Sequence, residues 1–100
     1  MVRHIVMIKL KDIPAAFERQ NAINQIKASL EALPDKISEI KNYEVGLNIN
    51  PNPLAYEIVL ISEFDNFNDL NSYKEHPEHI KVLELIAKYK ENSVFNDYIF

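Results

Sequence analysis

The sequence predicts an α+β protein with the element order βαββαβ, in which four strands form one antiparallel sheet and the helical segments cover one of its faces. Three observations predict this fold. Apolar residues alternate with a period of two in four segments, they recur with the helical period in two connecting segments, and Pro, Asn or Asp residues mark the boundaries. The chain has 100 residues, about the length of one typical domain, so we expect a single domain over residues 1–100.

The first strand and the first helix fill the N-terminal third of the sequence. Residues 2–10 alternate as a strand whose two faces are both largely apolar. One face carries Val2, His4, Val6, Ile8 and Leu10. Asp12 can cap the following helix, and Pro14 suits its first turn because that turn leaves backbone N–H groups unpaired. The apolar spacing extends this helix to about Leu33, and Pro34 ends it.

The middle of the chain predicts a hairpin. Residues 37–50 contain a strand that alternates strictly from Tyr43 to Ile49, and the Asn/Pro-rich residues 50–53 then break the chain. A third strand is expected over residues 54–64. Two strands joined by a short polar loop are most simply antiparallel neighbours.

A helical region and a closing strand complete the predicted order. Residues 65–69 offer several capping side chains, and a helical pattern follows through Tyr73. We expect His76 to end this helix and Pro77 to open another, because a residue before proline avoids the helical conformation. Residues 93–100 are expected to form the last strand. In this order, right-handed connections give a ferredoxin-like four-stranded antiparallel sheet with its helices on one face.

The face of the sheet that the helices leave open is predicted to be apolar. The first strand is apolar on both faces, and the third has apolar residues in both of its alternating sets. Large exposed apolar patches mark interaction surfaces, so we expect a homodimer in which two sheets pack face to face. The alternative is a monomer that leaves these residues half exposed.

Composition excludes several classes of function. The single glycine, Gly46, rules out Gly-rich phosphate loops and dinucleotide fingerprints, and the absence of cysteine rules out disulfides, thiolate metal sites and cysteine nucleophiles. The net charge of -4 with dispersed Lys and Arg gives no indication of nucleic-acid or membrane binding. We expect no cofactor, and a cytoplasmic location.

Histidine and tyrosine remain as the residues for any chemistry. His79 would be the third residue of its helix, where the helix dipole disfavours the charged ring and leaves a neutral group that can accept a proton. His4 lies on an apolar strand face, and Tyr73 lies one turn before His76, so all three can reach one cavity between sheet and helices. The alternative is that the histidines are structural and Tyr73 is a core aromatic. His76 and His79 have no third partner for a metal, and no metal site is expected.

Four segments resemble the stress-responsive dimeric α/β-barrel family. They are residues 3–11, the Val-Gly-Leu-Asn run at 45–48, the Tyr-x-x-His-Pro-x-His segment at 73–79, and Asp97-Tyr98. The resemblance implies a ferredoxin-like protomer and a homodimer whose two sheets form a central barrel. It supports the fold that the residue patterns predict.

The resemblance also implies a candidate activity. A plant polyketide cyclase of this family uses a histidine at the position of His79, assisted by a tyrosine at that of Tyr73, for an intramolecular aldol condensation, and a histidine at the position of His4 lines its pocket. A further pocket histidine of the cyclase falls at about Ile58 here, which makes this cavity less polar. Two hypotheses follow. One is a dimeric binding or stress-protective protein whose cavity holds a small apolar ligand or nothing, with His76 and His79 fixing the start of the helix. The other is an enzyme with His79 as general base and Tyr73 as hydrogen-bond donor.

Overall fold

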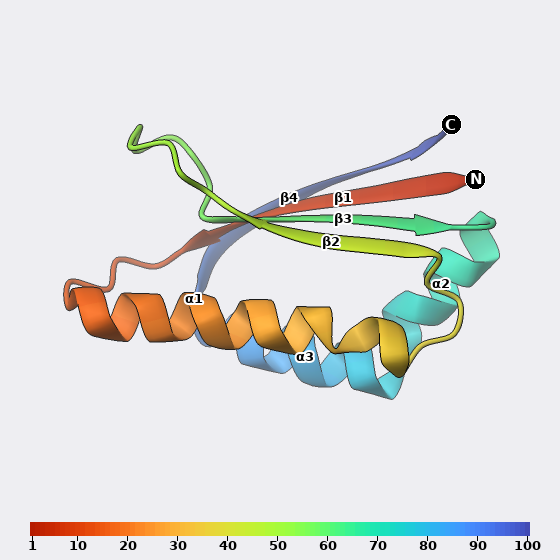
Figure 1. Cartoon of the computed structure of the whole chain (residues 1–100), viewed down its shortest axis with the longest axis horizontal. Coiled ribbons are helices and arrows are strands. Elements are labelled where there is room, and N and C mark those ends of the chain that lie inside the picture. The colour runs from red at the N-terminus through yellow and green to blue at the C-terminus, as the bar shows by residue number, and fades with distance from the viewer.

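The computed structural model describes residues 1–100, and it contains the predicted four-stranded antiparallel sheet. The elements are β1 (Val2–Leu10), α1 (Ala16–Glu31), the short 3₁₀ turn η1 (Leu33–Asp35), β2 (Asn42–Leu47), β3 (Ile58–Phe64), α2 (Phe67–Glu75), α3 (Pro77–Ala87) and β4 (Lys90–Ile99). The strands are ordered β2-β3-β1-β4, and the helices cover a single face of the sheet (Figure 1). None of these helices has the length and apolar content needed to cross a membrane. The ferredoxin-like fold is confirmed.

The first helix starts later than the sequence suggests. It begins at Ala16, its N-cap residue is Ala15, and no side chain caps it, so Asp12 does not have the predicted capping role. At the other end the helix stops at Glu31, and Pro34 lies in the η1 turn that follows. This turn has 3₁₀ geometry, which commonly tightens the end of an α-helix.

The hairpin strands are shorter than predicted, and residues 48–57 form a long loop between them. Three successive Asn side chains accept hydrogen bonds from backbone N–H groups two residues ahead: Asn48 from Asn50, Asn50 from Asn52, and Asn52 from Leu54. These local bonds compete with strand pairing. The alternation at residues 54–57 therefore does not make a strand, and the loop projects on the side of the sheet away from the helices (Figure 1).

The break between α2 and α3 is confirmed at the predicted residue. Asn66 caps α2 by accepting from the Asp69 N–H at 2.8 Å. His76 has an extended backbone, with φ -64° and ψ 134°, which ends α2 because Pro77 follows. His76 also caps α3, since its Nδ1 accepts from the Glu78 N–H at 3.1 Å.

The hydrophobic core lies between the helices and the inner face of the sheet. The inner face is made of alternate residues on each strand, and β3 shows the pattern fully, with every second residue buried from Ile58 to Phe64. The buried helix residues Ile26, Leu30, Val82 and Ile86 pack against this face. A closing contact joins the chain ends, where the Phe100 N–H donates to the Met1 carbonyl at 3.2 Å.

Candidate functional site

A row of four polar side chains crosses the otherwise apolar inner face of the sheet. Strand pairing places Tyr43 of β2 beside Ser62 of β3, Ser62 beside His4 of β1, and His4 beside Asp97 of β4. The His4 and Ser62 residues are buried, at 6% and 0% exposure. His4 Nδ1 donates to a carboxylate oxygen of Asp97, and the Ser62 hydroxyl donates to the His4 carbonyl. No fully buried side-chain nitrogen or oxygen atom lacks a hydrogen-bond partner.

Tyr73 of α2 packs over this row with its ring fully buried. Its hydroxyl lies 2.7 Å from the Tyr43 hydroxyl, and its ring lies against His79 with 4.3 Å between centroids. Burial raises the pKa of Tyr73 to about 12, while the bond from Tyr43 opposes that rise. Burial also raises the pKa of Tyr43 far above its ordinary value. Both phenols therefore stay protonated at neutral pH.

His79 occupies the first turn of α3, as predicted. Its Nδ1 lies 3.0 Å from the Lys74 carbonyl oxygen. Since a carbonyl only accepts, Nδ1 carries the proton, and in the neutral ring Nε2 is left with a free lone pair. Burial lowers the pKa of His79 below its ordinary value of 6.5, and the nearby His4, Lys74 and His76 add to the effect against the opposing Lys74 carbonyl bond. At neutral pH the ring is a base, not a cation.

A cavity of about 290 Å³ lies where these side chains meet the helices. The three sequence-predicted residues His4, Tyr73 and His79 all line it. Its apolar wall consists of Val6, Ile8, Leu30, Leu60, Leu83, Ile86 and Phe95. Leu83 and Phe95 are exposed at 46% and 69%, so the cavity reaches the surface beside them. Its volume is near the lower end of the range of about 300–1,000 Å³ that is usual for small-molecule sites.

No residue pattern marks Lys74 and Asp97 as site residues, although both lie in segments that carry the family resemblance. Asp97 accepts from His4 through one oxygen and lies 3.5 Å from Lys74 Nζ through the other. Lys74 lines the cavity, and its ammonium group lies 5.7 Å from the centre of the Phe95 ring. In the sequence Asp97 follows Asn96 between Phe95 and Tyr98, and the pairing of β4 with β1 brings its side chain onto the inner face.

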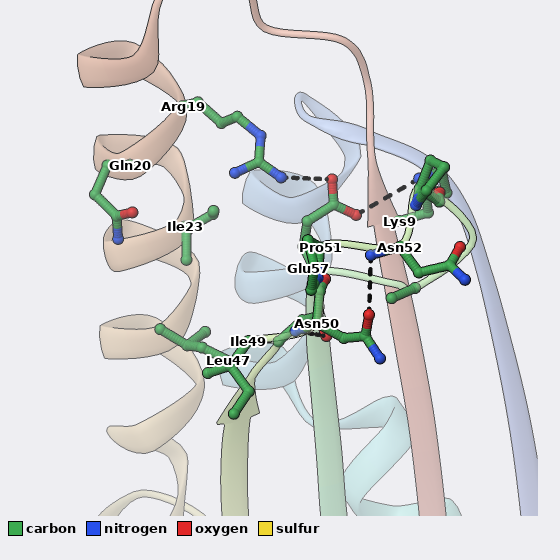
Figure 2. A pocket seen from close by; sticks show the side chains of 13 residues that line it. Lys9, Arg19, Gln20, Ile23, Leu47, Ile49, Asn50, Pro51, Asn52 and Glu57 are labelled. Atoms are coloured by element: carbon green, nitrogen blue, oxygen red, sulfur yellow. Dashed lines mark hydrogen bonds and ion pairs between the residues drawn. The ribbon is translucent and has the colours of Figure 1, made fainter.

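A second hollow, of about 430 Å³, lies between the start of α1 and the loop at residues 48–57. Glu57 is its centre, and it accepts from Arg19 at 3.0 Å and from the Leu10 N–H at 3.2 Å. Figure 2 shows Arg19 and Lys9 both directed at this carboxylate. Because its charges are paired with one another, this hollow has a structural explanation: Glu57 ties α1 and the end of β1 to the start of β3.

His76 does not join the cavity. Its ring nitrogen is used in capping α3, and it is absent from the cavity lining. No three His, Asp or Glu side chains come together in an arrangement that would hold a metal ion.

Comparison with known proteins finds relatives that share this fold. A dimeric protein with a ferredoxin-like fold from Bacteroides fragilis is 44% identical, with a TM-score of 0.91 over 99% of this chain and 95% of its own. An uncharacterised protein of Streptomyces coelicolor is 32% identical over 79 residues, which is 79% of each chain. The hydroxynitrile lyase of Passiflora edulis is 23% identical, with a TM-score of 0.83 over 99% of this chain and 90% of its own, a likeness that shows the fold alone.

The family model described as the stress responsive A/B barrel domain matches residues 2–100. The match covers all the strands and helices of the fold, including the Tyr-x-x-His-Pro-x-His segment. The chain belongs to the stress responsive A/B barrel domain family.

Proposed function

We propose that this protein is a homodimer in which each protomer binds a small apolar molecule in the cavity lined by His4, Tyr73 and His79. The observation that carries the proposal is the cavity itself. It combines an apolar wall with a few polar groups held in fixed positions, which is the usual composition of a small-molecule site. The dimeric relative from Bacteroides fragilis supports the assembly.

The open face of the sheet supports the homodimer. Strand pairing aligns Gly46, Val59, Met7 and Val94 in one row across all four strands, and Ile61 and Ile5 stand side by side in the next row. Met7 is 43% exposed although neighbouring strands flank it on both sides. Polar residues replace this apolar patch further along β1, where Arg3 pairs with Glu63 at 2.7 Å. An apolar centre with a polar rim is typical of a protein interface.

Light scattering after gel filtration tests the assembly. Met7→Glu places a charge at the centre of the open face and is expected to convert the dimer to a monomer, because an unpaired charge at a buried interface costs several kcal/mol. Phe17→Glu is the matched control, since Phe17 is 78% exposed on α1 and lies away from that face. A Met7→Glu protein that stays dimeric would contradict this interface.

Calorimetric titration with 1-octanol tests the binding site. We expect one molecule to bind per protomer, and we expect Leu83→Trp to weaken binding because the larger ring occupies the space beside the exposed end of the cavity. Phe17→Trp introduces the same ring at a 78% exposed position of α1, away from the cavity and from the open face, and should leave binding unchanged. Absence of binding to the wild-type dimer, or equal affinity in the Leu83→Trp protein, would refute the site.

A second candidate function is catalysis, and the state of His79 favours it. Its neutral ring has a free Nε2 lone pair and is held in place through Nδ1, so it can take a proton from an acidic C–H or O–H group. Tyr73 stays protonated. When the Tyr43 hydroxyl donates to the Tyr73 hydroxyl, the proton of Tyr73 is left free to donate a hydrogen bond to a developing enolate and stabilise it. The lyase from Passiflora edulis indicates that this fold accommodates enzymes.

Deuterium exchange distinguishes the two functions. In D₂O, with 2-octanone as the probe, His79 would take a proton from the carbon next to the carbonyl and the solvent would return a deuteron. The wild-type protein is expected to speed this exchange, and His79→Asn to abolish the acceleration while it leaves the dimer intact. If both proteins exchange at the rate of buffer, the histidine is structural, and its replacement should then chiefly lower the melting temperature.

A further inference from the structure

The charged groups that line the cavity are all basic. Lys74 and Lys90 contribute to its lining beside the histidines, and no Asp or Glu does. The chain as a whole has the opposite bias, with 15 acidic and 11 basic residues. The cavity lining is therefore positively charged although the protein as a whole is negatively charged. Its electric field favours a ligand with a negatively charged group.

Asp97 offsets only part of this positive charge, because it pairs with Lys74 while Lys90 makes no ion pair with a carboxylate. One of its oxygens accepts from His4 and the other lies 3.5 Å from Lys74 Nζ. Asp97 is not part of the cavity lining, so its carboxylate stands behind His4 and Lys74 as seen from the cavity. It orients these two groups and leaves other ammonium protons of Lys74 free for a ligand.

The surroundings of Lys74 hold its ammonium group near the cavity. The nitrogen lies 5.9 Å from the ring centre of Phe67 and 5.7 Å from that of Phe95, within the range of cation–π attraction. The side chain is 35% exposed, which reduces the cost of keeping it charged. Most of the remaining wall is apolar, and the cavity volume of about 290 Å³ is roughly ten times the ~30 Å³ share of one water molecule in the liquid.

We propose that the cavity selects a small organic anion, an apolar chain or ring that ends in one carboxylate or enolate, over the neutral analogue of the same shape. The apolar part lies along the wall, and Lys74 binds the anionic end. This inference rests on the proposed binding function and names the class of ligand for that site. Lys90 adds a second positive charge to the same cavity.

Calorimetric titration with sodium octanoate and with 1-octanol at the same pH and ionic strength tests the proposal. The two probes share their chain and differ in the charge of the end group. The wild-type dimer should bind octanoate roughly tenfold more tightly than octanol, the effect expected of one partly exposed charge-assisted hydrogen bond. Lys74→Met should weaken octanoate binding more than octanol binding and so remove that advantage, and Lys74→Arg should retain most of it.

Lys81→Met is the matched control. It also removes one positive charge and one ion pair, the contact of Lys81 with Glu78 at 3.2 Å, but Lys81 does not line the cavity. It should bind both probes as the wild type does. Equal binding of the two probes by the wild type would overturn the anion preference and leave the binding function standing, as would an equal loss in the Lys74→Met and Lys81→Met proteins. If neither probe binds, the binding function and this inference both fail.

Discussion

The hydrogen bond between Tyr43 and Tyr73 gives a quantitative test of how the site is built. The two hydroxyl oxygens are 2.7 Å apart, and they join an edge strand of the sheet to the α2 helix. Tyr73 is fully buried, whereas Tyr43 is only partly buried. Tyr→Phe at either position removes one hydroxyl and keeps the ring, so each variant isolates the bond from the packing.

The magnitudes follow from what each variant leaves behind. Tyr43→Phe removes the hydrogen-bond partner of the fully buried Tyr73 hydroxyl, and an unsatisfied buried group costs about 1–3 kcal/mol. Tyr73→Phe strands the hydroxyl of Tyr43, which water can reach more easily, so its cost should fall at the lower end of that range. The double variant leaves no unpaired hydroxyl group. Its loss of stability should therefore be small, because replacing both partners by apolar groups of the same shape is nearly neutral.

Urea denaturation followed by circular dichroism measures these costs, with all proteins at one protomer concentration because the stability of the proposed dimer would depend on it. A loss of 1 kcal/mol should also lower the melting temperature by about 4–8 °C in a protein of this size. Tyr89→Phe is the control, since its hydroxyl makes only an exposed contact of 3.5 Å to Gln25. If the two single losses simply add in the double variant, the bond does not contribute as described.

Two further predictions concern pH and the open face. The pKa of His79 is lower in the folded chain than its ordinary value of 6.5. Between these two pKa values the unfolded chain binds more protons than the folded chain. The stability due to the neutral ring is therefore present above pH 6.5 and declines as the pH falls through 6.5 toward the folded pKa. Titration by NMR should find His79 below 6.5, and a pKa at or above 6.5 would contradict the buried, neutral ring. Gly46→Ala should destabilise the protein by about 1–3 kcal/mol because the new Cβ would lie 2.8 Å from a methyl carbon of Val59. Adding Val59→Ala should restore part of this loss in the same denaturation assay. An unaffected Gly46→Ala protein would show that Val59 moves freely.

Much of the fold can be predicted from the sequence because its signals are local. Alternation fixes which face of β1 carries His4, and Pro77 fixes both the end of α2 and the position of His79 in the first turn of α3. The strand limits at residues 48–57 were predicted wrongly, because Asn side chains that bond their own backbone leave the apolar alternation unchanged while they prevent pairing.

The candidate site is predictable only in part, because it depends on pairing between distant strands. His4, Tyr73 and His79 stand out singly as polar groups in apolar patterns, and the structure brings them to one cavity. Asp97 and Tyr43 join them through the register of β4 with β1 and of β2 with β3, which no local pattern encodes. The position of Lys74 also depends on strand register. In the sequence Lys74 looks like an ordinary surface residue, and only the pairing of β4 with β1 places Asp97 beside it.

The proposed binding function requires the cavity between the sheet and helices α2 and α3 to be the ligand site. A crystal structure of the protein soaked with 1-bromohexane tests this requirement, because bromine is located by its anomalous scattering. We predict a bromine peak in each protomer within the cavity lined by His4, Tyr73 and His79. Peaks confined to the hollow around Glu57 or to the contact between the two sheets, with an empty cavity, would contradict the account.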